Sequence, residues 1–202
     1  MTAATMNTEP EAGARERLLT AALTLFNEKG YAATSVRELV QAAGVTKPVL
    51  YYYFGNKEGI FLELMAHSYS TFQSLAAEIG SLEGSARERI ARFSSELFEA
   101  SLENLPLVRL IYAIFYGPPQ GTPQFDIEAF FLGMIQVTEA LVRDGMAKGE
   151  LRQDSVEDVA RAIVAILSSS INEQICRKET KLDRDGMLRM LDLLMQGIVR
   201  QP

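Results

Sequence analysis

Apolar residues recur at three- and four-residue spacing along almost the whole chain, a pattern that predicts helices and no strand of any length. The first such stretch runs from residue 15 to residue 29, with apolar positions at Leu18, Leu19, Ala22, Leu23 and Phe26. Gly30 supplies a stop for this helix. Residues 1–14 are polar and show no such pattern, so we expect them to form a flexible N-terminal arm.

Two short helices, joined by a turn that contains glycine, follow the first one. Ser35 with Glu38 three residues later forms a capping box, which opens the first of them. Thr46 is suited to cap the second, and Pro48 is tolerated in its first turn because an amide hydrogen there has no partner within the helix. Together with the preceding helix, residues 15–57 therefore have the layout of a helix-turn-helix unit.

Three consecutive tyrosines occupy residues 51–53, in the second short helix. At 100° per residue Leu50 and Phe54 share one face, which we expect to be buried, while Tyr52 points away from it. These rings can simply cover apolar surface. The sharper hypothesis is a DNA recognition helix, because Lys47 and the tyrosine hydroxyls can donate hydrogen bonds to phosphates or base edges.

The distribution of charge agrees with a DNA-binding N-terminal part. The net charge of the chain is −6, but residues 1–57 contain six Lys or Arg against five Asp or Glu, and the remainder contains fourteen against twenty-one. A weakly basic N-terminal part on an acidic chain suits a nucleic-acid partner. Lys57 lies in the first turn of the next helix, where free amide groups and the helix dipole also favour a phosphate.

Residues 15–65 resemble the N-terminal DNA-binding domain of the TetR family of transcriptional regulators. The resemblance rests on the FxxxGY segment from Phe26 to Tyr31, on TSVRELVQAAGV, and on the LYYYF and NKE runs. It implies an all-α fold. In such a fold a three-helix DNA-binding head with the helix-turn-helix (residues 15–57) is joined to a larger helical-bundle domain for ligand binding and dimerisation (residues 58–202).

The resemblance also implies two groups of contacts with double-stranded DNA. The implied phosphate contacts are Ser35, Thr46, Tyr51, Tyr53 and Lys57. The implied base-reading positions are Arg37, Lys47, Pro48, Val49 and Tyr52. Tyr53 stands where many family members have histidine, so it can donate to a phosphate but cannot acquire a positive charge.

The last two long helices of residues 58–202 are apolar on more than one side, which predicts that each is buried on more than one side. We expect a homodimer in which these helices pack as a four-helix bundle, as the resemblance also implies; the alternative is that the single chain covers both faces. The predicted interface residues are Ile163, Ile166, Leu167, Met190, Leu191 and Leu194. Two recognition helices about 34–36 Å apart would then bind the halves of an inverted-repeat operator.

Residues 58–202 also contain many aromatic and methionine side chains with a few polar ones among them. For any single residue an ordinary packed core is the simpler explanation, but together they can enclose a pocket for a small, uncharged, hydrophobic effector. The resemblance to the TetR family implies that such an effector changes the separation of the two DNA-binding heads. The predicted lining residues are Phe72, Phe98, Tyr112, Phe115, Phe131, Met134, Thr138, Ser169 and Asn172.

The chain offers little for catalysis, since His67 is its only histidine, Cys176 its only cysteine, and no phosphate-binding glycine motif is present. We expect no metal site, no cofactor and no intrachain disulfide. Without a signal peptide or a membrane span, the expected location is cytoplasmic. The predicted function is a DNA-binding repressor released by a small hydrophobic effector. The alternatives are the same dimer controlled by a partner protein or by nothing, and a helical enzyme with an incidental helix-turn-helix.

Overall fold

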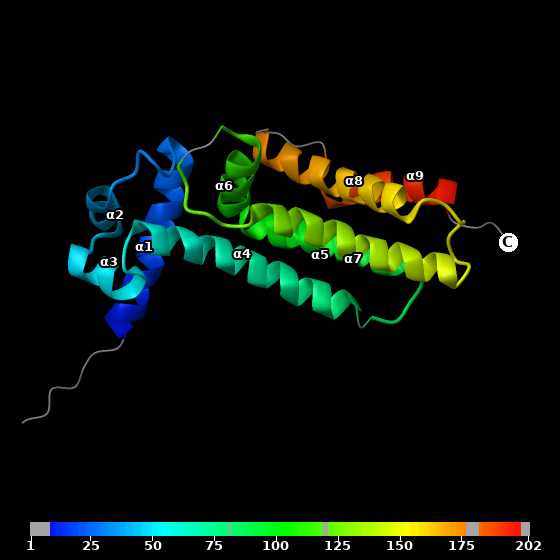
Figure 1. Ribbon diagram of the computed structural model, residues 1–202, viewed down its shortest axis with the longest axis horizontal. Helices are drawn as coiled ribbons and strands as arrows, with labels where there is room; N and C mark the ends of the chain where they lie inside the picture. The colour runs from blue at the N-terminus through cyan, green and yellow to red at the C-terminus, as the bar shows by residue number, and fades with distance from the viewer. Residues whose placement is uncertain (1–8, 81, 119–120, 177–181, 199–202) are drawn as a thin grey trace, which may run out of the picture. The chain divides into compact units, whose positions relative to one another are not determined.

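The computed structural model describes residues 9–80, 82–118, 121–176 and 182–198. Within these residues the chain forms nine α-helices and no β-strand, which confirms the predicted all-α fold (Figure 1). The helices are α1 (Glu9–Lys29), α2 (Val36–Ala43), α3 (Lys47–Phe54), α4 (Lys57–Gly80), α5 (Ala86–Glu103), α6 (Leu105–Tyr116), α7 (Ile127–Ala147), α8 (Val156–Cys176) and α9 (Arg184–Ile198). None of the helices in this part of the chain is long and apolar enough to cross a membrane.

Contacts divide the chain into two compact units. The first contains residues 1–68 and 109–125, and the second contains residues 69–108 and 126–202. The division falls inside two helices, because α4 begins in the first unit and ends in the second, and α6 begins in the second and ends in the first. The first turns of α4 therefore belong with the N-terminal helices, beyond the end of the predicted DNA-binding head at residue 57.

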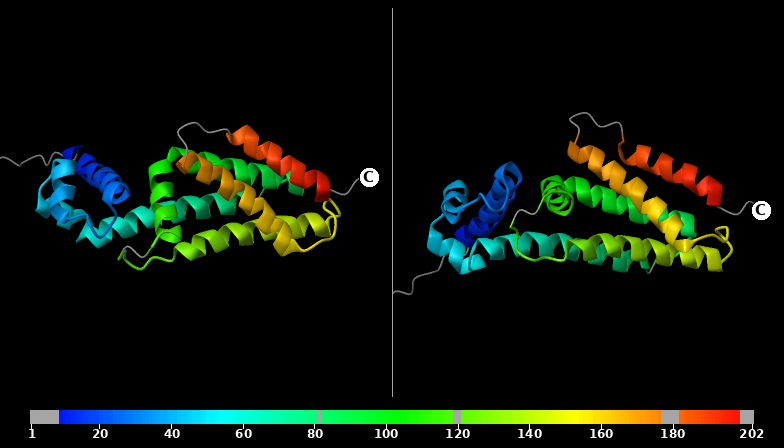
Figure 2. Two further views of the ribbon diagram at one scale, coloured as in Figure 1. Left: turned by 90° about the horizontal axis from the view of Figure 1, so that it is seen from above. Right: turned by 45° about the horizontal axis from the view of Figure 1, so that its top comes forward.

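In the first unit α1, α2 and α3 pack on one another beside the start of α4 (Figures 1 and 2). Each of these four helices contributes at least one fully buried apolar side chain to this core, among them Leu18, Leu39, Leu50 and Phe61. The regular apolar spacing along each helix accounts for the burial of one face. The three-helix arrangement with a helix-turn-helix is thus present as predicted.

Helix α1 is longer than the sequence analysis predicts. It begins at Glu9, so the expectation of an arm over residues 1–14 is wrong from residue 9 onward, while residues 1–8 lie outside the described part. Pro10 is compatible with the first turn of a helix, where an amide hydrogen has no partner within the helix. Ala14 is buried. A proline in a first turn is a local signal, and hydrophobic periodicity does not detect it.

The predicted capping box at the start of α2 is present, and a second one opens α5. Ser35 Oγ accepts a hydrogen bond from the Glu38 amide, and the Glu38 carboxylate accepts one from the Ser35 amide at 2.8 Å. Ser85 and Glu88 repeat this arrangement at the start of α5. At the other end of α2, Gly44 has a left-handed conformation with φ of 63°, which allows its amide to close the helix.

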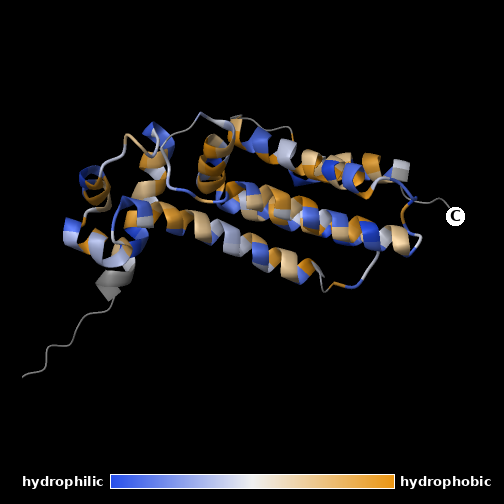
Figure 3. Ribbon diagram, in the orientation of Figure 1, coloured by the Kyte–Doolittle hydropathy of each residue, from blue (hydrophilic) through white to orange (hydrophobic). Residues whose placement is uncertain are grey.

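In the second unit α5, α7, α8 and α9 pack against one another as a bundle (Figure 2). The C-terminal part of α4 joins them through Phe72, whose ring lies 5.1 Å from the ring of Phe130 on α7. Hydrophobic and hydrophilic residues alternate along these helices in short bands (Figure 3). Buried residues of the bundle include Ile90, Phe93, Phe98, Val142, Ile163 and Leu167.

Candidate nucleic-acid interface

Helix α3 has one buried face and one face rich in tyrosine. Leu50 is fully buried and Phe54 is 8% exposed, whereas Tyr52 is 77% exposed and Tyr51 is 49% exposed. The ring of Tyr53, which is half-buried, meets the ring of Tyr52 edge-on at a centroid distance of 5.0 Å. The predicted burial of Leu50 and Phe54 and the outward direction of Tyr52 are therefore confirmed. The outward face offers phenol hydroxyls and ring surface to a partner.

The N-terminus of α3 carries further exposed polar groups. Thr46 occupies the N-cap position as predicted, but its side chain makes no capping hydrogen bond. Its hydroxyl thus remains a donor at the positive end of a helix, where a phosphate is favoured. Lys47 and Pro48 are exposed and Val49 is half-buried, so all four residues lie on or beside the tyrosine-rich face.

The start of α2 holds two other predicted DNA contacts, Ser35 and Arg37, both exposed. Ser35 Oγ also donates to Glu38 Oε2 at 2.7 Å, so a phosphate contact from this hydroxyl requires its proton to turn away from that carboxylate. Lys29 pairs with Glu38. Hydrogen bonds from Lys29 and Ser35 lower the pKa of Glu38 to about 2. The carboxylate of Glu38, the residue that follows Arg37, is thus already paired with a cation.

Lys57, the first residue of α4, is engaged inside the first unit. Its Nζ donates to the carbonyl oxygen of Tyr31 at 2.8 Å and to that of Thr34 at 2.9 Å. The same nitrogen lies 4.0 Å from the centre of the Tyr31 ring. Burial lowers the pKa of Lys57. The predicted phosphate contact is therefore held, in this structure, by the turn between α1 and α2.

Three cationic side chains make contacts that fix these helices, and none of these contacts can be predicted from the sequence. Arg17 Nε on α1 donates to the carbonyl oxygen of Ala43, at the end of α2, at 3.0 Å. Arg15 pairs with Glu63 on α4. Lys57 supplies the third contact. Arg17 is 26 residues from Ala43 in the sequence, and Lys57 is 26 residues from Tyr31. No periodic or local signal links positions so far apart.

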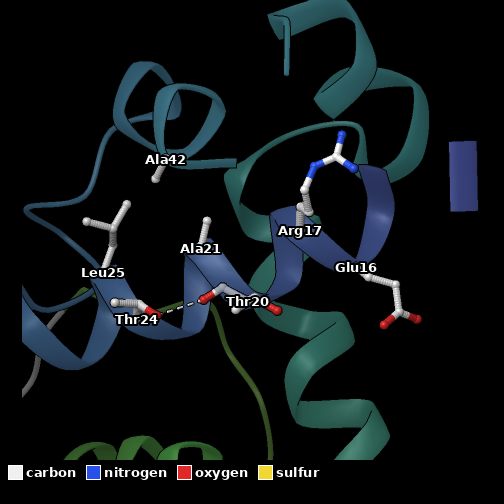
Figure 4. Close-up of a pocket in the computed structure, with 7 residues that line it drawn as sticks. All are labelled: Glu16, Arg17, Thr20, Ala21, Thr24, Leu25 and Ala42. Carbon is white, nitrogen blue, oxygen red and sulfur yellow. Dashed lines mark hydrogen bonds between the residues drawn. The ribbon is translucent and has the colours of Figure 1, made fainter. Parts of the chain in front are cut away.

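An open groove on the first unit is lined by six residues of α1 and by Ala42 of α2 (Figure 4). The α1 residues are Glu16, Arg17, Thr20, Ala21, Thr24 and Leu25. Thr24 Oγ1 donates to the carbonyl oxygen of Thr20 at 3.0 Å, so this hydroxyl is already used within the helix. No predicted DNA contact and no predicted effector residue lines this groove.

The predicted effector residues are divided between the two units. Tyr112 and Phe115 belong to the first unit and the other seven belong to the second. Of those seven, Phe72, Phe98, Met134 and Thr138 are buried, Phe131 is half-buried, and Ser169 and Asn172 are exposed. Thr138 Oγ1 donates to the Met134 carbonyl at 2.8 Å. The pocket itself stays a prediction.

Ser94 on α5 is a candidate pocket residue that sequence analysis overlooks. Its side chain is fully buried, and its hydroxyl has no hydrogen-bond partner among the described residues. It lies four residues before Phe98 on the same helix and therefore on the same face. A hydroxyl within an apolar stripe is a detectable signal for such a residue, because a buried polar group without a partner is costly.

The predicted dimer residues fall into two sets. Ile163, Leu167 and Leu191 are buried within the single chain, whereas Ile166, Met190 and Leu194 are half-buried. Leu193, one helical turn from Met190, is 69% exposed. Helix α9 thus leaves several apolar side chains at least partly exposed, beside exposed polar residues such as Arg189 and Asp192. The most exposed of these apolar side chains, Leu193, is missing from the predicted set.

The groups that could support other chemistry are few. His67 and Cys176 are both exposed. Across the described ranges, no group of three or more His, Cys, Asp or Glu residues is arranged to hold a metal ion. Cys176 Sγ lies 3.5 Å from Asn172 Oδ1.

Comparisons with known proteins agree with this geometry. The family model described as "Bacterial regulatory proteins, tetR family" matches residues 18–64. The transcriptional regulator AcuR of Cereibacter sphaeroides is 30% identical over 150 residues, which are 72% of this chain and 68% of that protein. The HTH-type transcriptional repressor NicS of Pseudomonas putida is 21% identical over 199 residues, 92% of either chain.

A similar fold is found in PfmR, a TetR family transcriptional regulator from Thermus thermophilus. Its structure matches with a TM-score of 0.73 and 27% identity, over 91% of this chain and 100% of that one. These proteins are regulators and not enzymes, which confirms both the resemblance and the prediction of a regulator. The chain belongs to the tetR family of bacterial regulatory proteins and is a DNA-binding transcriptional regulator.

Proposed function

We propose that this regulator is a homodimeric repressor that binds an inverted-repeat operator through α3 and the start of α2, and that a small hydrophobic effector releases it. The observation that carries this proposal is the exposure of Tyr51 and Tyr52 on a helix whose other face, Leu50 and Phe54, is buried. Tyrosine is enriched at interfaces, because it offers both an apolar ring and a hydroxyl that can form hydrogen bonds. The name of the relative NicS, a transcriptional repressor, supports the direction of control.

The division of labour among the DNA contacts follows their chemistry. Thr46, with a free hydroxyl at a helix N-terminus, suits a phosphate. Tyr52 and Lys47, two of the exposed residues of α3, suit base edges, sugars and thymine methyl groups in the major groove. Arg37 lies at the start of α2 and precedes Glu38, whose carboxylate is paired with Lys29. Phosphate contacts would fix the position of the helix, and base contacts would select the sequence.

Dimerisation is needed because one recognition helix reads only a half-site. Three apolar side chains of α9 that remain at least partly exposed, Leu193, Met190 and Leu194, support a two-fold contact with a second copy. Two-fold symmetry of the protein then matches an inverted repeat with half-site centres about one DNA turn apart. We place this DNA-binding activity in the cytoplasm.

Control by an effector requires two conformations with different affinities for DNA. An effector that binds more tightly to the conformation with low affinity for DNA lowers the affinity for the operator. The maximal decrease is the ratio of the effector's affinities for the two conformations. Switching from 99:1 to 1:99 needs a ratio of about 10⁴. The buried Phe72, Phe98 and Met134 favour an apolar effector, and the unpartnered Ser94 hydroxyl supplies one polar group for it. Because α4 is shared by both units, it is the element that can transmit the change.

The runner-up is the same DNA-binding dimer governed by a partner protein or by nothing. Thermal-shift screening with apolar compounds separates the two. A compound that raises Tm and weakens operator binding supports effector control, whereas a compound set without any stabilisation favours the runner-up.

Selection from a random DNA library tests the DNA-binding part of the proposal. It is carried out at about 0.15 M salt, because phosphate binding depends steeply on ionic strength. The expected result is enrichment of an inverted repeat by the wild-type protein and loss of enrichment by Tyr52→Ala. Tyr116→Ala is the matched control, since Tyr116 on α6 is also strongly exposed, at 68%, but lies outside the DNA-binding head. Absence of any enriched repeat would contradict the proposal.

A further inference from the structure

The Lys57 ammonium contacts three groups of the protein. Two of its N–H bonds are directed to the carbonyl oxygens of Tyr31 and Thr34, at 2.8 and 2.9 Å. The face of the Tyr31 ring lies 4.0 Å from the same nitrogen, within the range of a cation–π contact. An ammonium has three N–H donors, so a phosphate can take only the one that the two carbonyls leave, unless one of these contacts is given up.

The two carbonyls belong to the turn that leads into α2. Thr34 directly precedes Ser35, the N-cap of α2, and the turn is closed by hydrogen bonds from the Thr34 amide to Tyr31 O (3.2 Å) and from Thr34 Oγ1 to Gly30 O (2.9 Å). Lys57 thus holds the residues that set where α2 begins. Arg37, a predicted base contact, lies in the first turn of that helix.

An aromatic cluster fastens the same turn to α4 from the apolar side. Phe61, four residues after Lys57 and hence on the same face of α4, lies 5.2 Å from the Tyr31 ring in an edge-on arrangement. Phe26 of α1 contacts both rings, at 5.3 and 6.2 Å. Phe26 and Phe61 are almost completely buried. The first turn of α4 and the α1–α2 turn therefore form one packed body.

We propose that Lys57 is a positioning residue: it joins the first turn of α4 to the turn that presents Ser35 and Arg37, so that a displacement of α4 is passed to the DNA contacts at the start of α2. This inference rests on the proposed function, and it assigns to Lys57 a role other than the phosphate contact that the family resemblance implies. The arrangement gives α4 a direct connection to α2 that does not pass through α3.

Lys57→Met tests the inference because methionine keeps the aliphatic length and removes the charge and the donors. On the selected operator we expect affinity to fall roughly ten- to hundredfold, the size expected from losing hydrogen bonds to a charged group. The slope of log K against log salt should stay at the wild-type value, and affinity for random DNA should be unchanged. A slope smaller by about 0.9, the contribution of one phosphate contact, with equally weakened binding to random DNA, would overturn it. Lys47→Met is the comparison variant, because Lys47 is exposed on α3 and its loss should reduce the slope.

Lys57→Arg is a second variant that tests the same role of Lys57 if the methionine variant does not fold. Arginine keeps the charge and binds phosphate well, but its planar guanidinium does not replace an ammonium held between two carbonyls and a ring. Weakened operator binding by Lys57→Arg, with an unchanged slope, supports a positioning role. Affinity equal to that of the wild type supports a phosphate contact and overturns the inference.

Amide hydrogen exchange supplies a measurement that does not involve DNA. The full-length Lys57→Met protein should exchange the amides of Thr34 and Leu39 severalfold faster than the wild type, because both report on the α1–α2 turn and the first turn of α2. Unchanged exchange at both would overturn the inference. If the wild-type protein selected no operator, the proposed function would fail, and hydrogen exchange would still decide whether Lys57 holds this turn.

Discussion

Gly59, in the first turn of α4, lies directly against the carbonyl oxygen of Phe54, the last residue of α3, so that a Cβ atom at this position would overlap that oxygen. The side-chain oxygen of the nearby Asn56, Oδ1, accepts a hydrogen bond from the Gly59 amide at 2.8 Å. The corner between α3 and α4 is therefore set by close backbone packing. Because the obstructing atom belongs to the backbone, a larger side chain can be accommodated only if one helix moves.

Gly59→Ala should lower the free energy of unfolding by roughly 1–3 kcal/mol, the cost of overpacking, although alanine favours helix in an open position. Urea unfolding measures this change. Gly80→Ala, at the C-terminal end of the same helix, is the control, since a Cβ atom there meets nothing within 4 Å. Equal stability of Gly59→Ala and the wild-type protein would mean that the corner is not tightly packed.

Glu38 makes the stability of α2 dependent on pH. Its folded-state pKa of about 2, produced by hydrogen bonds from Lys29 and Ser35, lies below its ordinary value of 4.5. A depressed pKa of this kind contributes stability that is complete above about pH 5 and is lost as the pH falls toward 2. In Glu38→Gln, which keeps a capping acceptor without the charge, this loss should be absent.

Urea midpoints measured from pH 6 down to about pH 2.5 test the contribution of Glu38. The difference between wild type and Glu38→Gln is expected to be constant above about pH 5 and to shrink below it. A difference that does not vary across this interval would contradict the assignment of the lowered pKa to Glu38.

Local signals account for much of the fold. The Ser35–Glu38 and Ser85–Glu88 boxes place the starts of α2 and α5, and the spacing of Leu50 and Phe54 gives the buried face of α3. These features depend on residues three or four positions apart, which is the range over which a helix imposes its own geometry. The outward direction of Tyr52 follows from the same geometry.

Contacts between distant residues escape such reasoning. Nothing in the sequence near Lys57 indicates that its ammonium binds the carbonyls of Tyr31 and Thr34, because any main-chain carbonyl looks the same in a sequence. The contact from Arg17 to Ala43 is hidden for the same reason. Residue types and helical spacing thus predict which faces are presented, but tertiary packing determines which cations remain available for DNA.

Ser94→Ala should stabilise the protein without effector and weaken effector binding. The buried hydroxyl has no partner among the described residues, and removing a group of this kind saves about 1–3 kcal/mol of desolvation. Ser101→Ala on the same helix is the matched control. Its buried hydroxyl donates to the Leu97 carbonyl at 2.7 Å, so this change should destabilise. Thermal unfolding with and without an effector from the screen measures both effects, and a loss of stability in Ser94→Ala would contradict the assignment.

Leu193→Lys should shift the protein from dimer to monomer, because a charged side chain in an apolar interface loses its hydration without gaining a partner. Sedimentation velocity measures the change. Leu102→Lys is the control, as Leu102 is a 40% exposed leucine on α5, outside the predicted interface. A dimer in both variants would show that the outward face of α9 is not the contact between copies.

We propose that a dimer holds two copies of α3 at a fixed spacing and so binds one inverted repeat. Fluorescence anisotropy is measured on the selected operator and on the same operator with about 5 extra base pairs between its half-sites. The insertion rotates one half-site by half a turn, to the opposite side of the DNA. The affinity of the dimer should then fall to that for a single half-site. Undiminished affinity for the altered operator would mean that the spacing of the two α3 helices is not fixed.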